Sequence, residues 1–159
     1  MKKTLKMLED NAMLTAAEIA VLQGRDEAEV ADEIGRAKAG GILLGSRAVI
    51  DWDRAGGELV TAFIDVKVAP QRGVGFDRVA ERIYQFEEVR SLYLMSGGFD
   101  LQVVITGKTL KEVALFVAEK LSTLEMVTGT ATHFLLKKYK EGGVVYQKRE
   151  EQQERVTFL

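Results

Sequence analysis

VTAFIDVKV, residues Val60–Val68, is the stretch that decides the fold of this 159-residue chain. Its apolar side chains alternate with Thr61, Phe63, Asp65 and Lys67, which predicts a β-strand, and Pro70 ends the run because proline cannot donate to a ladder. The apolar residues that follow have the i, i+3, i+4, i+7 spacing of a helix: Phe76, Val79, Ala80 and Ile83.

A hairpin, a second helix and a last strand follow. Two strand-like runs, Val89–Ser96 and Phe99–Thr106, meet at Gly97–Gly98, a hairpin signal. Thr109-Leu-Lys-Glu112 is a capping box, and the helix it opens has one apolar face: Leu110, Val113, Ala114, Val117 and Leu121. Met126–Tyr139 is typical of a strand. The order β-α-β-β-α-β predicts a ferredoxin-like domain over residues 56–140, an antiparallel sheet with two helices on one face.

Apolar residues lie on both faces of these strands, although two helices cover only one. Residues of the second parity include Phe63, Leu92, Leu94, Val104 and Leu135. A second copy of the sheet is the simplest cover, so we expect a homodimer. The charged segment Glu141–Leu159 is expected to form a loosely held C-terminal tail.

Residues 1–55 predict a separate domain of three short helices, bounded by Gly56–Gly57. The first helix covers Thr4–Asn11; a capping box at Thr15–Glu18 opens the second, which should bury Ile19 and Leu22.

The third helix follows a tight turn that contains Gly24. Asp26 is its predicted N-cap, Val30 and Ile34 its buried residues, and Gly40 its end. Residues 42–52 predict an extended pair or ribbon. This arrangement suits a winged helix-turn-helix, although a plain three-helix bundle would show the same spacing. The predicted fold class is therefore α+β.

Composition excludes several kinds of chemistry. The chain has no Cys and one His, which excludes disulfides, thiolate sites and a His-rich zinc site. No P-loop or metal motif occurs, so we expect no catalytic residue, no metal, no cofactor and no enzymatic activity. Apolar runs are too short to span a membrane, and no signal core follows Met1–Lys6. We therefore expect a cytoplasmic protein without a membrane partner.

Three stretches of the second domain carry a resemblance to a known family: Gly75–Ile83, Leu94–Leu101 and Thr128–Phe134. Together with a looser match over Leu14–Ala20 and Gly40–Ile50, the chain resembles the Lrp/AsnC (feast/famine) transcriptional regulators across Leu5–Gly143. The resemblance implies a C-terminal ligand-sensing RAM domain, a dimer that assembles into higher oligomers, double-stranded DNA as partner, and an amino acid or related metabolite as effector.

The Gly97–Gly98–Phe99–Asp100 turn is the candidate effector site. Backbone N–H groups freed by glycine bind a carboxylate, and an Asp binds an ammonium group, so the turn suits an α-amino acid. Alternatively, this is a plain hairpin turn in which the Asp100 side chain hydrogen-bonds its own backbone. Thr130 and Thr132 share one face of the last strand, where their hydroxyls either complete the pocket, as the resemblance implies, or suit a strand. His133 has the opposite parity and is expected to be a packed or hydrogen-bonded residue and not a ligand.

The third helix should enter the major groove, yet it is crowded by Glu27, Glu29, Asp32 and Glu33. The whole net charge of −2 lies on residues 1–54, which hold eight Lys or Arg and ten Asp or Glu. Candidate DNA-binding residues are seven of these eight cations: Lys2, Lys3, Lys6, Arg25, Arg36, Lys38 and Arg47. Two hypotheses follow: a sequence-specific regulator with weak or assembly-dependent DNA binding, or a metabolite-sensing oligomeric scaffold with a degenerate helix-turn-helix.

Overall fold

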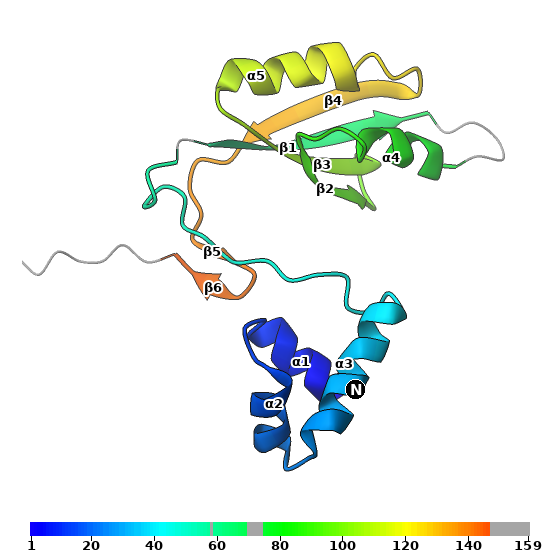
Figure 1. The fold of residues 1–159 in the computed structure, drawn as a ribbon. Helices are drawn as coiled ribbons and strands as arrows, with labels where there is room; N and C mark the ends of the chain where they lie inside the picture. Colours follow the sequence, from blue (N-terminus) through cyan, green and yellow to red (C-terminus); the bar gives the residue numbers. More distant parts are fainter. Residues whose placement is uncertain (58, 70–74, 147–159) are drawn as a thin grey trace, which may run out of the picture. The chain divides into compact units, whose positions relative to one another are not determined.

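A computed structural model describes residues 1–57, 59–69 and 75–146. The chain divides into two compact units, Met1–Val49 and Ile50–Leu159, so the structural division falls before the expected boundary at residue 55. Pro70, the expected end of the first strand, and most of the expected tail lie outside the described residues. Figure 1 labels the elements of both units.

The first unit holds the three expected helices, α1 (Lys2–Asp10), α2 (Ala16–Gln23) and α3 (Glu27–Ala39). The capping box of α2 is confirmed, because the Thr15 hydroxyl accepts the Glu18 N–H and the Glu18 carboxylate accepts the Thr15 N–H at 2.8 Å. Asp26 caps α3 through the N–H of Ala28 at 2.8 Å. Gly24 ends α2 at φ +63°, a conformation that favours glycine.

The core of this unit is small and differs from the expected one at Leu22. Ile19, Ala20 and Val30 are buried, whereas Leu22 is 62% exposed. The prediction for Leu22 is wrong because the inward stripe of α2 continues from Ile19 and Ala20 to Gln23. The amide of Gln23 donates to Thr4 Oγ1 of α1 at 3.2 Å.

The expected ribbon over residues 42–52 is not formed in the described part of the first unit and linker. Residues 44–51 run without strand pairing, and a turn follows at residues 52–56. The backbone N–H groups of Ile42 and Leu43 both donate to the Ala37 carbonyl, which ends α3. A ribbon needs a second strand for its hydrogen bonds, and the described residues of this unit supply none.

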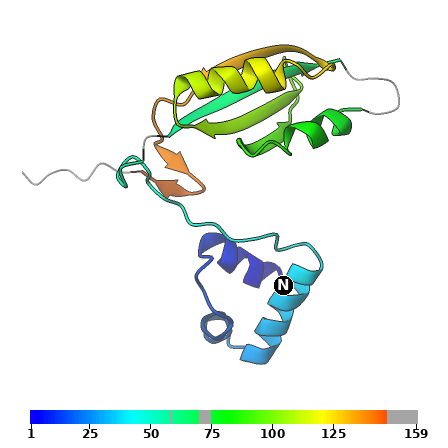
Figure 2. The same ribbon diagram turned by 45° about the horizontal axis from the view of Figure 1, so that its top comes forward.

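The second unit has the expected β-α-β-β-α-β order. Its elements are β1 (Val60–Val68), α4 (Asp77–Ile83), β2 (Val89–Leu94), β3 (Leu101–Gly107), α5 (Leu110–Leu115) continued by η1 (Phe116–Leu121), and β4 (Val127–Phe134). The strands form an antiparallel sheet in the order β2-β3-β1-β4. Figure 2 shows α4, α5 and the sheet from a second direction.

The register separates the two faces of this sheet. One face carries Ile64, Val66 and Val103, which are fully buried against Val79 and Phe116 of the helices. The other face, which we call the open face, carries the alternate residues of each strand, all half-buried or exposed: Thr61, Phe63, Asp65, Tyr93, Gln102, Val104, Thr106, Ala131 and His133. The predicted two-faced apolar pattern is confirmed at Phe63 and Val104. It is wrong for Leu92 and Leu94, because the β2–β3 register pairs them with Val103 and Leu101 on the helix-covered face and leaves Tyr93 on the open face.

The buried residues of the helix formed by α5 and η1 differ from the predicted apolar face. Val113 and Leu121 are buried as expected, but Leu110 and Ala114 are exposed and Phe116 is buried instead. Val113 and Phe116 are three residues apart, so the buried side of the helix runs between them and away from Leu110 and Ala114. Beyond Phe116 the period changes, because η1 is a π-helix in which the Ser122 N–H donates to the Val117 carbonyl five residues earlier. The wider turn brings Phe116 and Leu121 to the same side.

The last strand is shorter than expected and a small hairpin follows it. β4 ends at Phe134 rather than at Tyr139. The first residues of the expected tail are ordered, because β5 (Lys140–Glu141) pairs with β6 (Val144–Val145). A tail that begins at residue 141 is therefore wrong for residues 141–146. In the described ranges, no helix combines the length and apolar character that crossing a bilayer requires.

Candidate DNA-binding and effector sites

The β2–β3 turn, the candidate effector site, is tied to the end of β1. Asp100 Oδ2 accepts the Val68 N–H at 2.8 Å and lies 3.5 Å from Lys67 Nζ, which donates to the Gly98 carbonyl at 3.2 Å. Gly97 has φ +135°, a value that other residues rarely adopt. Asp100 thus bonds the backbone of β1, whereas the plain-hairpin interpretation expects a bond to the backbone of its own turn. Lys67, which the sequence did not single out, supplies a cation at the turn.

Thr130 and Thr132 are placed apart from the side chains of that turn. They pair with Val66 and Ile64, so they lie on the helix-covered side of the sheet. Lys67 pairs with Gly129 on the open side. Thr130 and Asp100 nevertheless flank the same residue, because the Asp100 N–H donates to the Val66 carbonyl. Within a single chain, the threonines and the Asp100 side chain thus lie at the same end of the sheet but on opposite faces.

A cavity of about 390 Å³ lies between α4 and β2. Its wall is mixed, with the apolar residues Phe76, Ala80 and Leu92 and the charged residues Asp77 and Arg90 among those that line it. None of the six predicted effector residues lines it. This volume falls within the range of small-molecule sites. The cavity is therefore a second candidate location for a ligand.

A polar cluster occupies the open face of the sheet. His133 Nε2 lies 3.2 Å from Asp65 Oδ2, and Gln102 Nε2 donates to Asp65 Oδ1 at 3.2 Å. His133 is exposed in the single chain, so it is not packed there, but its contact with Asp65 agrees with the alternative of a satisfied residue. The strand parity already placed Asp65 and His133 outside the core, but their pairing depends on the register between β1 and β4.

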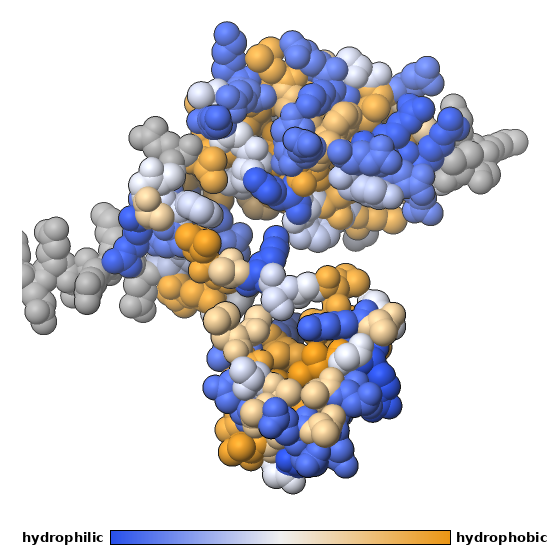
Figure 3. All heavy atoms as spheres, viewed as in Figure 1, coloured by the Kyte–Doolittle hydropathy of each residue, from blue (hydrophilic) through white to orange (hydrophobic). Residues whose placement is uncertain are grey.

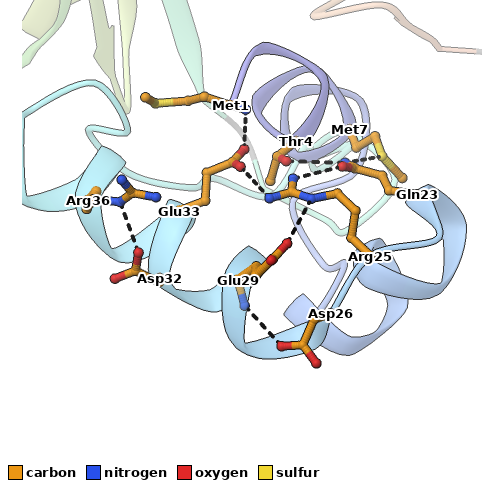
Figure 4. A network of polar contacts seen from close by, with 10 residues as sticks. All are labelled: Met1, Thr4, Met7, Gln23, Arg25, Asp26, Glu29, Asp32, Glu33 and Arg36. Carbon is orange, nitrogen blue, oxygen red and sulfur yellow. Dashed lines mark hydrogen bonds and ion pairs between the residues drawn. The ribbon is translucent and has the colours of Figure 1, made fainter.

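In the first unit, Arg25 belongs to a network of polar contacts (Figure 4). Its guanidinium lies 2.9 Å from Glu33 Oε2, 3.8 Å from Glu29, and donates to Gln23 Oε1 at 3.1 Å. Glu33 is only 6% exposed. Its pKa is lowered to about 2, first by the Met1 amine at 2.5 Å, then by Thr4, and also by Arg25.

This network shows that one of the four acids predicted to crowd the surface of α3, Glu33, is not at the surface. Glu33 points inward and does not crowd the outer surface of α3, because cationic and hydroxyl groups surround its carboxylate. Glu27, Glu29 and Asp32 remain exposed. Figure 3 shows hydrophilic residues gathered along the α3 side of this unit.

The predicted DNA-binding cations fall into two groups. Lys6 is paired with Glu9 and Asp10 of α1, Arg25 with Glu33, and Arg36 with Asp32 at 3.1 Å. The other four have no ion pair among the residues described: Lys2, Lys3, Lys38 and Arg47. Carboxylates of the same unit therefore partly neutralise three of the seven.

Comparison with known proteins places this architecture in a family. Residues 61–145 match the Lrp/AsnC ligand binding domain. The chain is 50% identical over 144 residues to the HTH-type transcriptional regulator YugG of Bacillus subtilis, covering 90% of this chain and 87% of that protein. It is 27% identical over 140 residues to the HTH-type transcriptional regulator FL11 of Pyrococcus furiosus, covering 88% and 89% of the two chains.

Solved structures share the fold. A feast or famine regulatory protein of M. tuberculosis, in complex with L-methionine, superposes with TM-score 0.72 at 21% identity, over 87% of this chain and 90% of that one. A Neisseria meningitidis transcriptional regulator, also in complex with L-methionine, gives TM-score 0.69 at 22% identity over 87% and 89%. With the domain match and the half-identical relative, these findings show that the chain belongs to the Lrp/AsnC family of HTH-type transcriptional regulators.

Proposed function

We propose that this protein is a sequence-specific regulator that binds double-stranded DNA through its helix-turn-helix and responds to an amino acid through its C-terminal domain. The carrying observation is that one chain joins a three-helix unit with a tight turn at Gly24 to a Lrp/AsnC ligand binding domain. The half-identical relative is itself named an HTH-type transcriptional regulator, which supports the proposal.

Assembly is part of this proposal. The open face carries Phe63 and Val104 beside polar residues, while α4, α5 and η1 pack on the opposite face. A second copy of the same face would remove this apolar surface from water. We propose a homodimer closed through the open faces, with further assembly into larger rings. Paired helix-turn-helix units would then bind two half-sites, and their avidity would offset the weak charge of one unit.

DNA binding is tested through the exposed acids of α3. The Glu27→Gln, Glu29→Gln double variant should bind promoter DNA more tightly, by about fivefold per carboxylate removed, because each repels phosphate by about 1 kcal/mol. Gel-shift titrations at low and moderate salt measure this, and affinity should fall as salt rises. Glu119→Gln removes an exposed acid of the second unit and serves as the matched control.

Glu33 has no place in that variant, since its carboxylate is buried. If the wild-type protein, shown to be assembled, binds no duplex at any salt, the scaffold hypothesis with a degenerate helix-turn-helix is correct instead. If the double variant and the Glu119→Gln control bind with equal affinity, α3 does not approach the phosphates.

The location of the effector is tested by two substitutions, Asp100→Asn at the β2–β3 turn and Asp77→Asn at the cavity. We propose that an α-amino acid binds at the β2–β3 turn, with its ammonium group on Asp100 and its carboxylate near the turn N–H groups and Lys67. Asp100→Asn keeps an oxygen for the Val68 N–H but removes the charge. It should abolish the rise in melting temperature that the responsive amino acid produces in wild type. The screen uses the proteinogenic amino acids one at a time, starting with L-methionine.

Asp77→Asn is the matched control, since Asp77 borders the cavity between α4 and β2. It should leave the amino-acid response unchanged. The opposite pattern, loss in Asp77→Asn with retention in Asp100→Asn, would move the effector from the turn to the cavity.

A further inference from the structure

The outward side of α3 is defined by its buried residues. Val30, Glu33 and Ala37 are the buried positions of this helix. At 3.6 residues per turn, Ala28 and Gly35 lie opposite the buried stripe and Asp32 lies next to them, while Arg36 lies at the edge of this side, one turn after Asp32. All four are exposed. If α3 enters the major groove, these residues meet the base edges first.

One charged pair lies at the edge of this outward side, from which the long side chain of Arg36 extends. Arg36 Nε lies 3.1 Å from Asp32 Oδ2, at i,i+4 spacing, and both side chains are 69% exposed (Figure 4). The pair differs from Arg25, whose guanidinium is held by the buried carboxylate of Glu33. Arg36 is therefore the cation of α3 that is both oriented by a neighbour and open to a ligand.

The surroundings of the pair allow close approach. Gly35 has no side chain, and a Cβ placed there would meet no other atom within 4 Å. Ala28 adds only a methyl group. The long guanidinium of Arg36 therefore projects beyond its neighbours on this side of the helix. The adjacent carboxylate also limits the rotamers of Arg36, which lowers the entropy lost on binding.

The chemistry of the pair matches one kind of base pair. A guanidinium donates two parallel hydrogen bonds to O6 and N7 of guanine, and a carboxylate accepts from N4 of cytosine. A neutral Asp–Arg pair also avoids the repulsion that a lone carboxylate meets near phosphates. We propose that Asp32 and Arg36 read a G·C base pair in the major groove, Arg36 on the guanine and Asp32 on a cytosine of the opposite strand. This inference rests on the proposed DNA binding.

The experiment uses the full-length assembled protein and a site selected from randomised duplexes. Wild type should select a site with an essential G·C pair, and replacement of that pair by A·T should weaken binding about 10- to 100-fold. Replacement of its guanine by 7-deazaguanine, which lacks only the N7 acceptor, should weaken binding as well. Arg36→Lys should reduce this discrimination, because an ammonium group lacks the fixed planar fork that donates to O6 and N7 in parallel.

Two further variants make the result specific. Asp32→Asn should relax selectivity at the same base pair, since an amide also donates hydrogen bonds. Lys38→Gln removes another exposed cation of α3 and should weaken binding to all sequences equally. Circular dichroism confirms that each variant is folded.

Two outcomes overturn the inference in distinguishable ways. Wild type that binds no duplex overturns the proposed function and this inference with it. Wild type that binds with an unchanged base preference in both Arg36→Lys and Asp32→Asn overturns the inference alone.

Discussion

Val104→Asp is expected to convert the assembled protein into monomers. Val104 lies on the open face opposite Phe63, and its neighbours along β3, Val103 and Ile105, face the buried core. The substitution therefore places a carboxylate at the proposed dimer interface without entering the core. Burying an unpaired charge costs several kcal/mol. Two such charges in a symmetric dimer should raise its dissociation constant at least about 100-fold.

Light scattering coupled to size-exclusion chromatography measures the mass of the variant. Leu110→Asp is the matched control, because Leu110 is an exposed apolar residue of α5, on the helix side of the sheet. The control should keep the dimer. Val104→Asp should also weaken DNA binding and lose avidity, since separated units no longer engage two half-sites at once. A Val104→Asp protein that stays dimeric and folded would show that another surface closes the dimer.

The fold of the second unit was predictable because its strands alternate strictly. In Val60–Val68 the side-chain period of two fixes which residues face the core, and the burial of Ile64 and Val66 follows. The π-helical turn at Phe116–Leu121 was not predictable in the same way. The search for a 3.6-residue period places Ala114 inside, whereas the buried side runs through Val113 and Phe116 and the wider turn carries it on to Leu121.

In the candidate sites, too, local motifs were predictable and contacts between distant residues were not. The turn at Gly97–Asp100 is visible in the sequence, because glycine pairs and an Asp mark it. Its connection to Lys67 and Val68 depends on a register between strands far apart in the chain. Glu33 is the sharpest case, since its acidic neighbours suggest a solvated helix face. Only the fold brings Thr4 and Arg25 around its carboxylate.

Glu33→Gln is expected to destabilise the first unit markedly. The carboxylate of Glu33 is buried and contacts Arg25 at 2.9 Å, and Thr4 also bonds it. Glutamine keeps the shape of the side chain but removes the charge, so Arg25 loses its closest partner and the contact between α1 and α3 weakens. The melting temperature of this unit should fall by about 5 °C or more. Differential scanning calorimetry of the full chain resolves the transition.

The pH dependence of stability gives the same prediction a second readout. The pKa of Glu33 is about 2 in the folded protein, against an ordinary value of 4.5. A lowered pKa means that the unfolded chain binds the proton more readily than the folded one. The ionised carboxylate therefore stabilises the fold above pH 4.5, and this contribution is lost as the pH falls from 4.5 towards 2. Glu33→Gln should flatten the decline in stability across this window.

Glu29→Gln is the matched control for both readouts. Glu29 lies on the same helix and near the same guanidinium, but at 3.8 Å and with an exposed side chain. A solvent-screened pair of this kind contributes little to stability. Its removal should therefore leave both the melting temperature and the acid limb nearly unchanged. Equal losses in Glu29→Gln and Glu33→Gln would mean that the total negative charge of α3, and not the buried carboxylate, holds the three helices together.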